Sequence, residues 1–385
     1  MFKLSAVRGL TPILAAVSML FLPASLPVGA PFALAQGSTS PAPAPAKAAD
    51  GQSPGTQKTP DAQKPADVQK PTEGQKPEDQ QPEETLKVSV NVVGLFFNVK
   101  DKHGALIPSL TKNDFDVFED GKPQTIKYFA AESNLPLTLG ILIDSSGSQL
   151  RVLDMEKEVG GAFLKQILTD KDEAYVIDFN VDASLVQDFT RDVHRLQTAL
   201  NKVKINTGIT QPMIGSGGPV PTSQQAAGTV LYDAVYLSAH DMLAKEVGRK
   251  AMILLTDGED EGSRLKIKDA IEAAQKADAI VYVLLCADRG FYGSYGMGYS
   301  GEGEMRKLTE QTGGRVINVG NKFDKLKEAF DQIAAELRSQ YNLGYTSTNT
   351  LLDGGYRKLE IKSKQNYKIQ SRAGYYATPR EPLPQ

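Results

Sequence analysis

The chain of 385 residues contains no tryptophan, one cysteine and three histidines. The single cysteine, Cys286, excludes an intramolecular disulfide, so the stability of the fold has to come from packing. The histidines, His103, His194 and His240, are scattered, and they form no H-E-x-x-H pair and support no obvious nucleophile. The formal net charge of −3 is too small to predict a basic surface for nucleic acid. Composition therefore disfavours a disulfide-stabilised protein, an enzyme that uses a histidine metal pair or a histidine-supported nucleophile, and a nucleic-acid-binding protein.

The first 35 residues have the features of an export signal. Lys3 and Arg8 precede an apolar stretch at residues 10–22, and the segment ends in Ala33-Leu34-Ala35, the small-x-small pattern of a signal-peptidase site. Four prolines disfavour a regular membrane-spanning helix here: Pro12, Pro23, Pro27 and Pro31. We predict a signal peptide over residues 1–35 and an exported chain, whether periplasmic, cell-surface or secreted. An uncleaved anchor is the alternative.

Residues 36–84 cannot form a hydrophobic core. Nine of the 22 prolines fall between residues 37 and 83, where there is no aromatic residue, leucine or isoleucine. A loose Gln-Lys-Pro repeat recurs at residues 63–65, 69–71 and 75–77. This composition predicts a disordered, polyproline-biased linker. A spacer at the cell envelope and a leader without a binding role both fit it.

Two β-rich segments, residues 85–134 and 339–378, lie on either side of a longer segment, and residues 379–385 form a tail. Asp120-Gly121 predicts a tight hairpin turn that joins the strands expected at 116–119 and 125–129, because both positions of such a turn need a positive φ. The strands predicted in the two flanks include residues 116–119, 125–129, 341–346, 356–363 and 367–376. Neither flank is long enough to bury a core alone. We therefore predict that the two flanks fold together as one small all-β domain.

Residues 135–338 alternate between predicted strands and helices. Apolar runs at residues 137–143, 251–255 and 280–285 indicate buried strands, and apolar residues at helical spacing follow them. Alternation of this length predicts an α/β fold with a doubly wound, mostly parallel sheet, inserted between the two β-rich flanks. In such folds ligands bind beyond the carboxyl ends of the central strands.

A carboxylate and two hydroxyls follow the first of these strands in a D-x-S-x-S turn. Asp144, Ser146 and Ser148 carry oxygen atoms, which are the ligands that Mg²⁺ and Ca²⁺ prefer. Asp and Ser are also common in turns and at helix starts, and Ser148 could cap the helix predicted from Leu150. Taken alone, the turn fits either interpretation.

Two distant segments bear on this turn. The strand at residues 251–255 leads into Asp257, and Thr229 precedes a helix predicted from Leu231. If the strands that carry Asp144 and Asp257 are neighbours in a parallel sheet, both carboxylates emerge at the same edge. Five oxygen-bearing side chains are then candidates for one metal site: Asp144, Ser146, Ser148, Thr229 and Asp257.

With these five residues, the chain resembles the von Willebrand factor type A (vWA) family. In that family a D-x-S-x-S turn, a separate Thr and a separate Asp form a metal-ion-dependent adhesion site (MIDAS). The resemblance covers about residues 135–338 and implies a six-stranded, mostly parallel sheet with helices on both faces and Mg²⁺ at its top. Residues 110–121 and 372–376 look like the flanks of a vWA-related family described mainly from acidobacteria.

The resemblance implies metal-dependent adhesion or protein–protein interaction. Ser146, Ser148 and Thr229 would be neutral ligands, so Mg²⁺, or Mn²⁺ or Ca²⁺ in its place, would stay electrophilic toward an acidic residue of a protein partner. We expect no catalysis and no nucleic-acid partner, and association with the cell envelope fits the export signal. The alternatives are an envelope scaffold whose hydroxyls are helix caps beside a non-essential metal site, and a hydrolase that uses metal-bound water.

Two further features lie near the predicted strand ends. Glu259, Asp260 and Glu261 follow Asp257, and we interpret them as a solvated acidic turn rather than as metal ligands. Cys286 ends an apolar run, which predicts a buried and inert thiol rather than a nucleophile.

Two long loops are the remaining candidates for function. Residues 206–228 lead to Thr229, and we favour a role in partner specificity, with disorder as the competing account. Residues 289–303 form a Gly- and Tyr-rich loop that suits partner recognition or packing over the sheet edge. A G-x-G-x-x-G match at residues 296–301 does not directly follow a strand, so it does not predict a dinucleotide site.

Overall fold

The computed structural model describes residues 92–131, 135–206, 228–287 and 300–377. All of these residues belong to one unit, Glu83–Gln385. Outside them lie the predicted signal peptide at 1–35, the linker at 36–84, the tail at 379–385, most of both long loops, and the G-x-G-x-x-G match apart from Ser300 and Gly301. Among the described residues, no helix combines the length and the apolar character that spanning a membrane demands.

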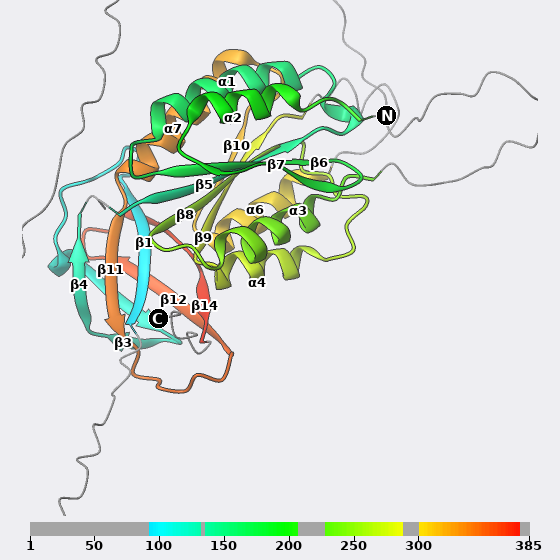
Figure 1. Cartoon of the computed structure of the whole chain (residues 1–385). Helices are drawn as coiled ribbons and strands as arrows, with labels where there is room; N and C mark the ends of the chain where they lie inside the picture. The colour runs from blue at the N-terminus through cyan, green and yellow to red at the C-terminus, as the bar shows by residue number, and fades with distance from the viewer. Residues whose placement is uncertain (1–91, 132–134, 207–227, 288–299, 378–385) are drawn as a thin grey trace, which may run out of the picture. The chain divides into compact units, whose positions relative to one another are not determined.

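A six-stranded sheet forms the centre of the α/β domain (Figure 1). In spatial order its strands are β10 (Val316–Asn318), β9 (Ala279–Leu285), β8 (Arg249–Thr256), β5 (Leu137–Asp144), β6 (Glu173–Phe179) and β7 (Ala183–Thr190). Five strands run parallel, and the edge strand β7 runs antiparallel to β6. Both β5 and β9 are buried along their whole length, as expected of parallel strands covered on two faces. The predicted six-stranded, mostly parallel sheet is confirmed.

Helices cover both faces of this sheet (Figure 1). One face packs against α1 (Leu153–Ile167), α2 (Val193–Lys202) and α7 (Phe323–Arg338), and the other against α3 (Leu231–Leu237), α4 (Ile267–Lys276) and α6 (Gly301–Thr312). Successive side chains of a strand point to opposite faces. Ile141 and Ile143 of β5 accordingly join the first core, and Leu142 joins the second. The doubly wound arrangement thus follows from the apolar run of β5.

The two β-rich flanks form two four-stranded sheets. One has the order β13-β1-β11-β4, and the other has the order β14-β12-β2-β3. The bounds are β1 (Val92–Lys100), β2 (Phe115–Glu119), β3 (Lys122–Gln124), β4 (Ile126–Ala130), β11 (Tyr341–Thr346), β12 (Tyr356–Ser363), β13 (Lys368–Ser371) and β14 (Gly374–Tyr376). Each sheet combines strands that precede and follow the α/β domain, and both contribute to one hydrophobic core. The α/β domain is therefore inserted into a small all-β domain, as predicted.

Two details of the strand prediction are wrong. Asp120 and Gly121 do have positive φ angles of 48° and 77°, but their turn joins β2 to the short strand β3. The strand predicted at 125–129 is β4, which pairs with β11 in the other sheet. The strand predicted at 367–376 is divided at Arg372 into β13 and β14, which also belong to different sheets. In both places the chain passes from one sheet to the other, which local sequence pattern does not reveal.

A buried carboxylate, Glu336 of α7, joins the α/β domain to the β domain. Its Oε1 accepts from Lys100 Nζ of β1 at 2.8 Å and from Arg315 Nε at 2.7 Å. Its Oε2 accepts from Gln370 Nε2 of β13 at 3.0 Å, and its backbone oxygen accepts from Asn98 Nδ2 at 2.8 Å. Every described oxygen of Glu336 is thus bonded to a neighbouring element, which ties α7 to β1 and β13.

Candidate metal site

The carboxyl ends of β5 and β8 meet at one edge of the sheet. The two strands are parallel neighbours, with Ile143 opposite Leu255, so Asp144 and Thr256 end their strands side by side. Asp257 follows directly after Thr256 and is buried, as is Asp144. The adjacency on which the predicted site depends is therefore present, and it brings the two carboxylate-bearing strand ends together.

The Asp144 side chain is fixed by two hydrogen bonds. Its Oδ1 accepts from the backbone N–H of Ser146 at 2.9 Å, and its Oδ2 accepts from the Thr256 hydroxyl at 2.7 Å. Thr256 Oγ1 in turn accepts from the backbone N–H of Gly258 at 3.0 Å. The predictions from the sequence include no role for Thr256, although a hydroxyl at the end of the strand next to that of Asp144 indicates a possible hydrogen bond to this carboxylate. Thr256 holds the Asp144 carboxylate in place at the top of the sheet.

The hydroxyls of Ser146 and Ser148 lie 3.0 Å apart. Neither serine caps the following helix: α1 begins at Leu153, its N-cap is Val152, and Ser146 precedes the 3-10 turn Gly147–Gln149 without a side-chain cap bond. The interpretation of Ser148 as a cap of this helix is therefore wrong. Two adjacent hydroxyls that are not used as helix caps remain beside Asp144.

Thr229 is attached to the loop that follows Asp257. Its backbone oxygen accepts from the N–H groups of Glu261 and Gly262, both at 3.1 Å. The two segments approach so closely that a Cβ on Gly228 would lie 2.8 Å from the Glu261 carbonyl carbon. Thr229 does not cap α3, whose N-cap is Val230. Thr229 is a half-buried residue on a segment held against the Asp257 loop.

Burial makes the two carboxylates electrostatically costly. Burial, together with the nearby charge of Asp257, raises the pKa of Asp144 to about 7. A divalent cation would offset both effects. No group of three or more His, Cys, Asp or Glu suited to a metal occurs within the described ranges, so a metal here would depend on hydroxyls as well. Two carboxylates and three hydroxyls are hard oxygen donors, and they fit Mg²⁺, Mn²⁺ or Ca²⁺.

The acidic turn after Asp257 has structural contacts of its own. Glu259 Oε1 accepts from the backbone N–H of Gly301 at 2.8 Å, at the N-terminus of α6, where a negative charge is favourable. Asp260 Oδ1 accepts from Tyr232 N at 3.2 Å and from the Ser263 hydroxyl. Glu259 and Asp260 are thus half-buried and hydrogen-bonded within the protein, whereas Glu261 is exposed, and the interpretation that none of the three is a metal ligand stays a prediction.

Cys286 follows β9 and is fully buried. Burial raises the pKa of its thiol well above the ordinary value, and the Glu156 carboxyl adds to this effect. A thiol that stays protonated is a poor nucleophile, so the environment of Cys286 is that of an inert core residue.

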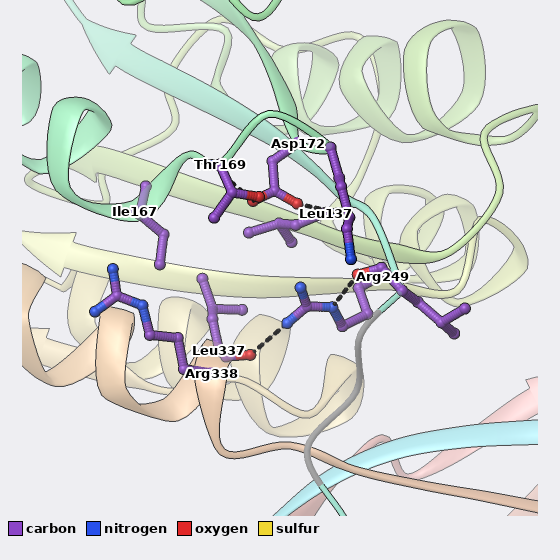
Figure 2. A pocket seen from close by; sticks show the side chains of 9 residues that line it. Leu137, Ile167, Thr169, Asp172, Arg249, Leu337 and Arg338 are labelled. Carbon is purple, nitrogen blue, oxygen red and sulfur yellow. Dashed lines mark hydrogen bonds between the residues drawn. The ribbon is translucent and has the colours of Figure 1, made fainter.

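A cavity of about 250 Å³ lies at the opposite edge of the sheet (Figure 2). Leu137 and Arg249, the first residues of β5 and β8, line it. Arg249 donates from Nη1 to the backbone oxygen of Leu337 at 2.6 Å, and Asp172 accepts from Leu137 N at 2.8 Å (Figure 2). Leu137 begins β5 and Asp144 ends it, so the cavity is separate from Asp144.

No family model matches the chain, and no curated protein matches it. Similar solved structures include the conserved hypothetical protein BatB from Bacteroides thetaiotaomicron, with 20% identity and a TM-score of 0.37 over 53% of this chain and 100% of that one. Proximal thread matrix protein 1 from the mussel byssus, with a zinc-occupied MIDAS motif, is 15% identical with a TM-score of 0.41 over 58% of this chain and 50% of that one. A von Willebrand factor type A protein from Catenulispora acidiphila is 14% identical with a TM-score of 0.39, over 70% and 75%.

Identities and TM-scores this low support no conclusion about the function of this chain, and its fold is described from its own strands and helices. The sheet of five parallel strands and one antiparallel edge strand, covered by helices on both faces, is the α/β architecture that the vWA resemblance implied. The narrower resemblance to the acidobacterial family stays a prediction, as does the set of five metal ligands.

Proposed function

We propose that this chain is an exported vWA-type protein that binds a protein partner through a divalent metal ion held by Asp144, Ser146, Ser148, Thr229 and Asp257. The observation that carries the proposal is the pair of buried carboxylates, Asp144 and Asp257, beside two hydroxyls that cap no helix. A buried pair of like charges is costly unless a cation accompanies it. No catalytic role is proposed for these residues.

The five residues have two kinds of role in this proposal. Asp144 and Asp257 supply the negative charge, and Ser146, Ser148 and Thr229 supply neutral oxygens. A bound Mg²⁺ ion with few charged protein ligands would offer a coordination position to an acidic side chain of the partner. The hydrogen bonds from Ser146 N and Thr256 Oγ1 keep the Asp144 carboxylate oriented before any metal arrives.

The location follows from the sequence rather than from the fold. The signal-like residues 1–35 support export, and the proline-rich segment after them suits a spacer. We propose a protein of the cell envelope or its exterior. A scaffold in the same location would have the same leader and linker but would not depend on the metal.

Calorimetric titration with Mn²⁺ and Mg²⁺ tests the metal site directly. The chain should bind one ion, and Asp257→Asn should weaken binding by at least about 10-fold, since it removes one of two charged ligands. Asp331→Asn is the matched control, because Asp331 lies on the surface of α7 and pairs with Lys327. An unaltered affinity in Asp257→Asn would contradict the proposed ligand set.

Capture of envelope proteins on the immobilised chain tests the function. Binding should be lost in EDTA, return with Mg²⁺, and be absent from Asp257→Asn. Capture that persists in EDTA would favour the scaffold.

A further inference from the structure

Asn180 lies just beyond the end of β6, next to the D-x-S-x-S turn. Its side-chain Nδ2 donates to the hydroxyl of Ser145 at 2.7 Å. Ser145 stands between the proposed ligands Asp144 and Ser146 and is fully buried. Its backbone N–H donates to the backbone oxygen of Phe179 at 2.9 Å. The turn is thus attached to the end of β6 by a side-chain bond and a backbone bond.

The same residue contacts two other segments that border the site. Its Oδ1 accepts from Asn206 Nδ2 at 3.3 Å, and its backbone oxygen accepts from Val230 N at 2.7 Å. Val230 directly follows the proposed ligand Thr229. Asn206 also donates its backbone N–H to the backbone oxygen of Ser145 at 2.9 Å. Asn180, Ser145 and Asn206 are therefore each hydrogen-bonded to the other two.

These contacts connect segments that are far apart in the sequence. The turn at 144–148 follows β5, Asn180 lies between β6 and β7, and Asn206 and Thr229 both lie in the connection between α2 and α3. Their common neighbour is a half-buried carboxamide that can donate on one side and accept on the other. Both capacities are used: Nδ2 toward Ser145, and Oδ1 toward Asn206.

We propose that Asn180 is a positioning residue of the metal site, which sets the Asp144–Ser148 turn and the Thr229 segment in register before metal binding. The inference rests on the proposed function, because it assigns Asn180 a role toward ligands named there. Residues that orient metal ligands typically account for about 10- to 100-fold in metal affinity. Without the Asn180 carboxamide, ordering of the turn would have to accompany metal binding and would weaken it.

Mn²⁺ titration of Asn180→Ala tests the proposal. The affinity should fall by about 10-fold or more, whereas Asn318→Ala should have no effect. Asn318 is a matched control, since it is an exposed asparagine at the carboxyl end of β10 in the same sheet. An affinity of Asn180→Ala equal to that of the parent protein would overturn the proposal.

A double-mutant cycle separates positioning from general loss of structure. If Asn180 acts through Ser145, the losses in Mn²⁺ affinity from Asn180→Ala and Ser145→Ala should be non-additive, because each removes the same hydrogen bond. Fully additive losses would overturn this route of action.

Hydrogen exchange of the metal-free protein gives a readout that does not need a metal. In Asn180→Ala, the amides of Ser146 and Asn206 should exchange faster, while those of β8 and β9 should not change. Faster exchange in a protein that binds no metal would support the positioning of the turn and refute the proposed function. Unchanged exchange, with metal affinity intact, would refute the positioning role alone.

Discussion

The described structure buries carboxylates in several regions, and two of these regions surround the buried acids with different groups. At the junction of the two domains, Glu336 lies against Lys100 and Arg315, so the protein itself supplies the opposite charge. At the carboxyl edge of the sheet, Asp144 lies near a second carboxylate, Asp257, and its pKa is raised to about 7 by burial and by that neighbour. The first arrangement is complete as an element of structure, whereas the second would be stabilised by the cation that we propose.

Glu156 of α1 is another buried acid, and it is neutralised in a third way. It is fully buried, its neighbouring polar group is the Cys286 thiol, and neither carboxylate oxygen has a partner at ordinary hydrogen-bond geometry. Burial, with a smaller contribution from the charges of Asp144 and Asp257, raises the pKa of Glu156 to about 8. A proton therefore neutralises Glu156. The comparison distinguishes an acid paired with basic side chains, an acid neutralised by a proton, and a pair of acids for which we propose a metal.

The largest loss of stability is expected from a substitution of Glu336, at the junction of the two domains. Glu336→Ala should lower the free energy of unfolding by about 3–5 kcal/mol, because it leaves Lys100 and Arg315 buried or half-buried without their common partner. Urea denaturation measures the change. Asp331→Ala on the same helix removes only an exposed pair with Lys327 and should cost less than about 1 kcal/mol. Equal effects of the two substitutions would show that burial of the Glu336 network contributes nothing.

The second-largest effect is a dependence of the free energy of unfolding on pH, which we expect to come from Glu156. Between about pH 4.5, its ordinary pKa, and about pH 8, the folded protein holds a proton that the unfolded chain has released. The free energy of unfolding should therefore fall as the pH rises through this window, by up to about 1.4 kcal/mol per pH unit. Below the window the contribution is fully present, and above it the contribution is lost.

Glu156→Gln should remove this dependence. Measured by urea denaturation in EDTA, the variant should match the parent protein near pH 4.5 and exceed its stability by about 2–4 kcal/mol above pH 8. Glu158→Gln, an exposed position on the same helix, controls for the general effect of one charge. A stability difference that does not vary with pH would contradict a protonated Glu156.

The sequence predicted the carboxylates of the sheet edge because topology determines their position. Parallel neighbouring strands end at one edge, so an acid after each of two apolar runs is enough to predict that Asp144 and Asp257 come together. The same logic could not reveal Glu336, which occurs in an ordinary helical pattern. Its burial depends on Lys100 and Gln370, which come from strands of the other domain.

Contacts that depend on which strands pair in the sheet could not be predicted from the sequence either. Asn180 is a common turn residue, and only the placement of β6 beside β5 gives it Ser145 as a partner. The strand at 126–130 likewise follows β3 closely in the chain but pairs with β11. Local pattern indicates a strand, whereas the choice of its partner depends on which sheet buries its apolar face.

The smallest change in stability should come from Asp144→Asn, and its sign distinguishes the two regions. In EDTA at pH 8 this substitution should stabilise the protein by about 1–3 kcal/mol, since it removes one of two neighbouring buried charges while an oxygen can still accept from Ser146 N. Saturating Mn²⁺ should reverse the order, because an ion at 100 times its Kd adds about 2.7 kcal/mol to the parent protein alone. Thermal unfolding with and without Mn²⁺ measures both. A loss of stability in EDTA, as expected for Glu336→Ala, would mean that Asp144 is compensated within the protein and that its site needs no metal.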